Sequence, residues 1–264
     1  MDQLTQKELV RARYGGIAEA AGDASCCAPS ASCCGPAADP NSKSREMGYS
    51  QAELAAVPEG ANLGLGCGNP QAIAALKPGE IVIDLGSGAG FDCFLAAGQV
   101  GETGHVIGVD MTHEMLKKAR ENAAKVGARN VEFRLGELEH LPVADNIADV
   151  ILSNCVINLV PDKAQVYREA FRALKPGGRL AISDVVNKAP LPAKLKDDPA
   201  LLCGCIAGAA TVEETETTLG KAGFVDIRVM PKAESRELIG SWAPGTGIED
   251  FVISAMVEGR KPAV

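Results

Sequence analysis

The sequence has few aromatic side chains and no long apolar segment. Aromatic residues make up 4% of the 264 residues, and there is a single tryptophan. Any core must therefore be built mainly from alanine, valine, isoleucine and leucine, which a hydrophobic content of 46% allows. Because no run of eighteen apolar residues occurs, we do not expect a membrane-spanning helix.

An excess of basic charge and a secretory leader are also missing. The net charge is -8, with a pI near 5.0, so the chain lacks the electrostatic footprint of a nucleic-acid-binding protein. Its first residues, MDQLTQKELVRARYGG, have no apolar stretch of the kind found in signal peptides. We therefore expect a cytoplasmic protein with mostly reduced thiols and no nucleic-acid or membrane partner.

Cysteine, in contrast, is abundant: the chain has nine. A chain of this length does not need a disulfide framework, and an odd number argues against complete pairing. Only three histidines are present and no C-x-x-C pair occurs, so a structural zinc site has little support. We interpret Cys93, inside an expected helix, as a small core residue.

From residue 49 onward, apolar runs that end in glycine or an acid alternate with helical patterns. The pattern predicts an α/β fold with a central, mostly parallel sheet and helices on both faces. Thr211 and Glu214 have the spacing of a capping box and predict a helix start. The expected strands are 81–86, 105–110, 131–135, 149–154, 179–185, 225–230 and 251–257, and the expected helices include 91–100, 115–126, 162–174 and 200–210.

These elements divide the chain into three parts. Residues 1–48 form a cysteine-rich, partly disordered segment that begins with one short helix. Residues 49–186 form a Rossmann-like domain that binds a cofactor. Residues 187–264 contain an insertion and the late strands that complete the sheet.

A glycine-rich turn, DLGSGAG, follows the first expected strand. Asp84 precedes Gly86, Gly88 and Gly90 at alternate positions, which departs from the G-x-G-x-x-G pattern of dinucleotide sites. Such a turn alone is also compatible with a tight connection that binds nothing. Two further features fall at the ends of the next strands, where α/β sheets bind ligands: Asp110 with Met111, and Gly136 with Glu137.

Together these motifs resemble those of the class I S-adenosylmethionine-dependent methyltransferases. The resemblance implies that the cofactor is S-adenosyl-L-methionine. It further implies that Asp110 holds the ribose and that Met111 and Glu137 contact the adenine. The cofactor-binding residues expected in this sequence are Asp84, Gly86, Gly88, Gly90, Asp110, Met111, Gly136, Glu137 and Asn154.

Three cysteines lie in loops rather than in the low-complexity segment. Cys67 is flanked by glycines, Cys155 follows the fourth expected strand, and Cys205 lies in Cys-Gly-Cys after the fifth. Three thiolates suit a soft, three-coordinate ion such as trivalent arsenic. Each cysteine alone is also compatible with a buried apolar role.

The segments NLGLGCGNP, SNCVINL and CGCIAGA resemble the three cysteine signatures of the arsenite S-adenosylmethionine methyltransferases. The resemblance implies that Cys67, Cys155 and Cys205 bind arsenite as the catalytic, arsenic-ligating set, with no structural metal. It also implies a disulfide relay that thioredoxin or glutathione resets. The candidate relay residues are the two vicinal pairs Cys26, Cys27, Cys33 and Cys34, which could equally form a tail that scavenges metalloids.

Three alternative functions remain open at this point. A methyltransferase acting on carbon, nitrogen or oxygen needs an apolar or aromatic pocket, which the low aromatic content disfavours. A metalloid-binding protein without activity accounts for the thiols but leaves the glycine turn unexplained. A redox sensor predicts a reversible disulfide and no methyl acceptor. The resemblance also implies a further C-terminal domain in longer family members, which we expect to be truncated or absent here. This expectation leaves open how far methylation proceeds.

Overall fold

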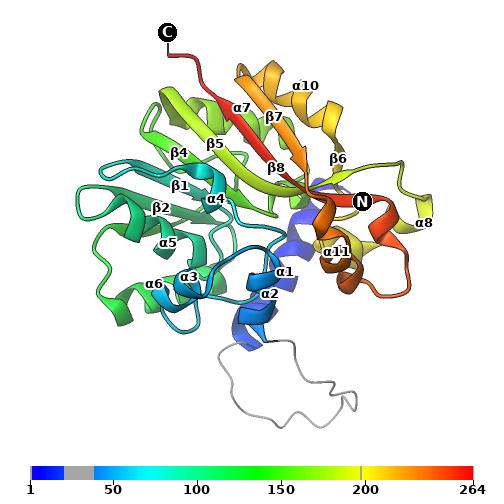
Figure 1. Ribbon diagram of the computed structural model, residues 1–264, viewed down its shortest axis with the longest axis horizontal. Helices are drawn as coiled ribbons and strands as arrows, with labels where there is room; N and C mark the ends of the chain where they lie inside the picture. The colour runs from blue at the N-terminus through cyan, green and yellow to red at the C-terminus, as the bar shows by residue number, and fades with distance from the viewer. Residues whose placement is uncertain (1, 21–38, 197, 264) are drawn as a thin grey trace.

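The described residues fold around one sheet, whose strands lie side by side in Figure 1. This computed structural model describes residues 2–20, 39–196 and 198–263. Within these residues the strand order is β3-β2-β1-β4-β5-β8-β7, and β6 pairs with the end of β5. The strands are β1 (Ile81–Leu85), β2 (His105–Asp110), β3 (Val131–Leu135), β4 (Ala148–Asn154), β5 (Leu174–Asn187), β6 (Ala210–Thr211), β7 (Val225–Pro231) and β8 (Val252–Arg260).

The pairing directions confirm the predicted Rossmann-like sheet. Strands β1 to β5 pair in parallel, whereas β8 runs antiparallel between β5 and β7. The carboxyl ends of β1, β2 and β4 therefore meet at one edge. In α/β folds this is the edge where ligands bind.

Alternate residues of the central strands face opposite layers of helices. Ile83, Ile107 and Ile151 pack with the layer that contains α7 (Lys163–Ala173) and α10 (Val212–Ala222). Val82, Val106 and Val150 pack with the other layer, which contains α4 (Gln71–Ala74), α5 (Phe91–Val100) and α6 (His113–Val126). Both faces are covered, as expected for strands that are apolar on both sides.

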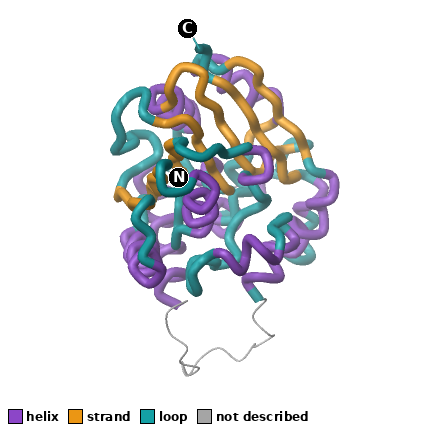
Figure 2. Tube along the Cα trace, turned by 60° about the vertical axis from the view of Figure 1, so that its left-hand side comes forward, coloured by secondary structure: helices purple, strands orange, loops and turns teal. Residues whose placement is uncertain are grey.

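The remaining helices gather near the carboxyl edge. In Figure 2 most of the purple helices lie below and around the orange strands. They are α1 (Gln3–Ala20), α2 (Pro40–Glu46), α3 (Gln51–Ala56), α8 (Ala193–Lys196), α9 (Pro199–Cys203) and α11 (Arg236–Trp242), together with the short 3-10 turns η1 (Ile157–Leu159), η2 (Ala233–Ser235) and η3 (Ile248–Asp250). None of the described helices combines the length and apolar character that a bilayer crossing requires.

Two of the local expectations were wrong and one is confirmed. The helix expected over 200–210 ends at Cys203, because Gly204 caps it and Cys205 has φ of 63°. The N-terminal helix is longer than expected, with 18 residues. The capping box at Thr211 and Glu214 is present with both of its hydrogen bonds.

Candidate active site

A cavity of about 510 Å³ lies at the carboxyl edge of the sheet. Its size suits a small organic ligand. The ends of β1, β2 and β4 form one wall, and α1 with the residues around α9 and α11 covers the opposite side. Residues from the first to the last quarter of the chain therefore contribute to one site.

The predicted glycine turn connects β1 to α5 and forms part of this wall. Gly86 and Gly88 line the cavity and have φ of 72° and 51°. Gly90 does not line it. A Cβ there would lie 2.7 Å from the Phe94 ring, so Gly90 serves the close packing at the start of α5.

Asp110, at the end of β2, is held in a fixed orientation. Its Oδ2 accepts a hydrogen bond from the Gly88 amide at 2.9 Å, and its Oδ1 accepts one from the Thr112 amide at 2.8 Å. Burial raises the pKa of this carboxyl group. Met111 also lines the cavity; its contact with adenine stays a prediction.

Two further carboxylates line the cavity beside the glycine turn. Asp84 and Asp92 are 3% and 6% exposed. Burial, and then the charge of Asp92, raises the pKa of Asp84 well above its usual range; burial also raises the pKa of Asp92. Neither forms an ion pair within the described residues, and a buried charge without a partner is costly. The site is therefore suited to a positively charged ligand.

Gly136 and Glu137 follow β3 as expected but lie outside this cavity. The Glu137 carboxylate pairs with Lys7 at 2.7 Å and Arg11 at 3.3 Å, and the hydrogen bond from Lys7 lowers its pKa. The next two residues, Leu138 and Glu139, line the cavity instead. Lys7 also pairs with Glu139 at 2.9 Å. The contact of Glu137 with adenine stays a prediction.

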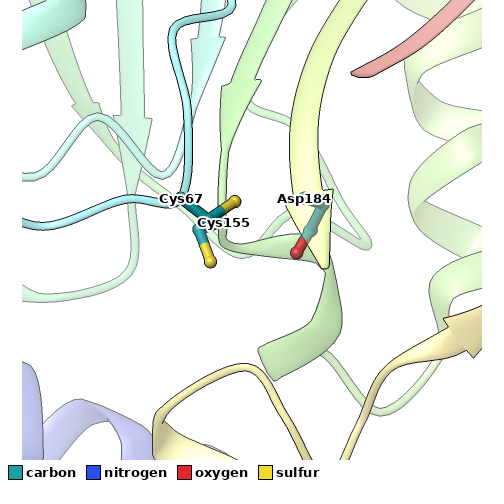
Figure 3. Close-up of side chains that lie close together, drawn as sticks. All are labelled: Cys67, Cys155 and Asp184. Carbon is teal, nitrogen blue, oxygen red and sulfur yellow. The ribbon is translucent and has the colours of Figure 1, made fainter. Parts of the chain in front are cut away.

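Cys155 and Cys205 line the same cavity, and Figure 3 shows Cys67 and Asp184 beside Cys155. The ligand atoms of Cys67, Cys155 and Asp184 all lie within 4.8 Å of one another. Cys205 approaches Cys155 from the chain after α9, and its Sγ donates to the Cys155 carbonyl oxygen at 2.7 Å. Cys205 thus adjoins Cys155, but the group whose ligand atoms lie within 4.8 Å of one another contains Asp184 in place of Cys205. Arsenic binding by the three cysteines stays a prediction.

The backbone at two of these cysteines is strained. Cys155 has φ of 57° and Cys205 has φ of 63°, a left-handed conformation that costs a residue with a side chain about 1–3 kcal/mol. Such strain occurs often at functional sites. Cys203 also lines the cavity, while Cys93 is fully buried in α5 and donates to Asp84 at 3.2 Å.

The surroundings of Cys155 and Cys205 raise the pKa of both thiols. Hydrogen bonding with Cys205, then with Cys67, and burial raise the pKa of Cys155 well above its usual range. At Cys205 the hydrogen bond with Cys155 lowers the pKa, but burial together with the neighbouring Asp184 and Cys67 outweighs it, and the net shift is upward. These thiols can therefore condense with the hydroxyl groups of a soft element and release water.

Comparison with known proteins agrees with this geometry. Residues 76–223 match the family described as a methyltransferase domain. The chain is 52% identical to an arsenite methyltransferase of Halobacterium salinarum over 274 aligned positions, covering 99% of this chain and 68% of the relative. The chain belongs to the arsenite methyltransferase family.

Two more members show how the chain relates to the family. An arsenite methyltransferase of Aquipseudomonas alcaligenes is 45% identical over 62% of this chain, which spans about half (49%) of that relative's length. The crystal structure of an arsenic(III) S-adenosylmethionine methyltransferase from Chlamydomonas reinhardtii superposes with a TM-score of 0.61 at 34% identity. That match covers 84% of this chain and 74% of the algal chain.

Several site residues of this arsenite methyltransferase family member were not found from the sequence. Asp92 lies in the first turn of α5, where an acid is also a common helix-start residue. Tyr49 and Asp184 carry no local motif. Glu139 lines the cavity two residues after Glu137, which does not. The four candidate relay cysteines, Cys26, Cys27, Cys33 and Cys34, lie outside the described residues.

Proposed function

We propose that this chain transfers the methyl group of S-adenosylmethionine to trivalent arsenic held by Cys67, Cys155 and Cys205. One observation carries the proposal. Cys67 and Cys155 lie together beside Asp184, Cys205 adjoins Cys155, and these thiols adjoin a cavity whose carboxylates suit a cationic methyl donor. Such adjacency is what direct transfer between two bound reactants requires.

The cavity residues fit S-adenosylmethionine. Asp84 and Asp92 are buried acids without an ion-pair partner among the described residues, and the cofactor carries positive charge on its sulfur and its amino group. Asp110 would hold the ribose hydroxyls, and Met111 with Leu138 would pack on the adenine. When bound, the cofactor supplies a methyl group on a positively charged sulfur.

The protein contributes positioning rather than acid–base chemistry. Arsenite loses its hydroxyl groups as water when the three thiols condense with it, and each thiol proton leaves with one hydroxyl group. The arsenic lone pair can then attack the methyl carbon without a general base. The backbone strain at Cys155 and Cys205 holds their sulfurs toward the cavity, and α1 covers the site on its open side. Preorganised, partly desolvated groups of this kind are an effective source of rate enhancement.

A reductant completes the electron balance. Formation of the arsenic–carbon bond breaks the carbon–sulfur bond of the donor, releases a neutral thioether and oxidises arsenic by two electrons. Two thiols can return those electrons by forming a disulfide, which an external thiol then reduces. We assign the external step to thioredoxin or glutathione and the internal step to the N-terminal cysteines, in a cytoplasmic setting.

The decisive experiment separates arsenic species after incubation with arsenite, S-adenosylmethionine and a thiol reductant. Cys155→Ser and Cys205→Ser should abolish methylation of every arsenical, because serine does not hold trivalent arsenic. Cys67→Ser should impair methylation of arsenite more than that of a monomethylated substrate, which needs fewer sulfurs. Cys203→Ser is the matched control and should keep most of the activity.

Three outcomes would contradict the proposal in different ways. Normal activity of Cys155→Ser would refute the thiolate cage. Methyl transfer to another acceptor that survives loss of both Cys155 and Cys205 would favour a carbon, nitrogen or oxygen substrate. Binding of both ligands with no methylated arsenical would favour a metalloid-binding protein.

A further inference from the structure

A network of buried and partly buried hydrogen bonds joins the acidic end of the cavity, at Asp84 and Asp92, to the loop that carries Cys67. It starts at Asp92, whose carboxylate accepts from the Tyr49 hydroxyl at 2.8 Å and 3.0 Å. The same carboxylate accepts from the Asn154 amide at 3.3 Å. Tyr49 is 3% exposed and also accepts from Asn154 at 3.0 Å.

Asn154 extends this hydrogen-bond network to both sides of the Cys67 residue. Its Nδ2 donates to the Gly68 carbonyl at 2.8 Å, and its Oδ1 accepts from the Cys67 amide at 3.1 Å. Gly66 packs so closely that a Cβ there would lie 2.8 Å from the Asn154 side chain. Asn154 also directly precedes Cys155, so one side chain adjoins both of these cysteines.

The hydrogen bonds leave Asn154 no spare donor. Its two amide protons are shared among the Gly68 carbonyl, the Tyr49 hydroxyl and Asp92. The single Tyr49 proton faces the Asp92 carboxylate. Bonds to a charged group are the strongest in such a network, and each one polarises the next. The position of the Asp92 charge therefore orients Tyr49 and Asn154, and through them the Cys67 loop.

We infer that Tyr49 and Asn154 are positioning residues that couple the binding of the methyl donor to the binding of arsenite at Cys67. Without a cation, Asp84 and Asp92 repel each other inside the protein. A cationic ligand between them relieves the repulsion and holds Asp92 in place, which stabilises the Asn154 bonds to Cys67 and Gly68. Coupling between binding sites is reciprocal, so arsenite must strengthen donor binding by the same factor.

The test measures the affinity of sinefungin, an unreactive cationic analogue of the donor, with and without saturating arsenite. Trp242 is the single tryptophan and lines the cavity, so its fluorescence can report binding by the full-length protein under reducing conditions. In the wild type, arsenite should tighten sinefungin binding by about fivefold or more. In Tyr49→Phe the enhancement should fall below about twofold, while each ligand still binds alone.

Tyr167→Phe is the matched control. It removes another buried tyrosine hydroxyl, from α7 in the core on the opposite face of the sheet, and should keep the full enhancement. Asn154→Ala is the second variant and should also lose it. A merely structural role of Tyr49 would weaken each ligand alone without changing the ratio of the two affinities.

The inference rests on the proposed function, but the two can fail separately. No enhancement in the wild type, or a full enhancement in Tyr49→Phe or Asn154→Ala, overturns the coupling even if arsenite is methylated. Failure of the wild type to bind sinefungin or arsenite overturns the proposed function as well.

Discussion

Replacing Asp184 with asparagine should flatten the dependence of folding stability on pH. Asp184 lies beside the thiol cluster, and burial raises its pKa from 3.8 to about 6. A difference of about two units between the folded and unfolded states corresponds to about 3 kcal/mol. Because the folded-state value is the higher one, this stabilising contribution is fully present below pH 3.8 and is lost as the pH rises through about 6.

The size of the effect can be worked out for an accessible pH range. From about pH 4.5 to about pH 8, the Asp184 contribution to the free energy of unfolding should fall by about 2 kcal/mol. The asparagine variant lacks this titration. In the wild type, the Ile157 amide donates to the Asp184 carboxylate at 3.1 Å. The asparagine side chain would place its own NH₂ donor group opposite that amide. That penalty lowers its stability by an amount that does not depend on pH.

The assay is denaturant unfolding of the ligand-free, reduced protein at several pH values. The quantity compared is the change in unfolding free energy with pH, not its absolute value. Asp84, Asp92 and Asp110 also have raised pKa values, but they are present in both proteins and cancel. Parallel curves for wild type and variant, within about 0.5 kcal/mol, would refute the reasoning.

Two further predictions concern the cofactor end of the site. Gly86→Ala should lower the melting temperature and the affinity for S-adenosylmethionine, because its Cβ would lie 2.6 Å from Val156 and φ is positive, at a cost of about 1–3 kcal/mol. Gly98→Ala is the control, because nothing lies within 4 Å of a Cβ at that position. Calorimetry should give this variant a melting temperature equal to or above that of the wild type. Equal losses of melting temperature in both variants would contradict the argument. The affinity for S-adenosylmethionine should fall as the pH is lowered from about 7 to about 5, since a cation favours the ionised forms of Asp84 and Asp92. Titration calorimetry measures this affinity, and a value that does not change with pH would contradict the prediction.

The parts of the fold that sequence patterns predict are those set by local physics. The strands at 81–85 and 105–110 are apolar runs that end at a glycine or an acid, and the structure has strands there. The capping box at Thr211 is equally local. In contrast, 200–210 is a run of small apolar residues that suits a helix, and the helix stops because Cys205 must turn its thiol toward the Cys155 carbonyl. No pattern within that segment records a partner fifty residues away.

The same distinction applies to the site. The sequence gives no reason to choose between Glu137 and Glu139. In the structure both pair with Lys7 of the N-terminal helix, at 2.7 Å and 2.9 Å, but Glu137 also pairs with Arg11 and only Glu139 lines the cavity. Tyr49 and Asp92 meet across 43 positions of the chain. Residue types that supply chemistry are visible in a sequence, whereas the hydrogen-bond partners that position them come from the whole fold.

The glycines around Cys67 show how the two kinds of information combine. In the sequence they indicate a loop. In the structure, a Cβ at Gly68 would overlap the Ser183 hydroxyl, and one at Gly66 would press on Asn154. Glycine is needed at both positions because the backbone packs against β5 on one side and against Asn154 on the other. This packing keeps Cys67 buried, 2% exposed, beside Cys155. The loop is therefore held in place by close packing, and a substitution that adds even one methyl group at Gly66 should displace Cys67 from the cluster before it unfolds the protein.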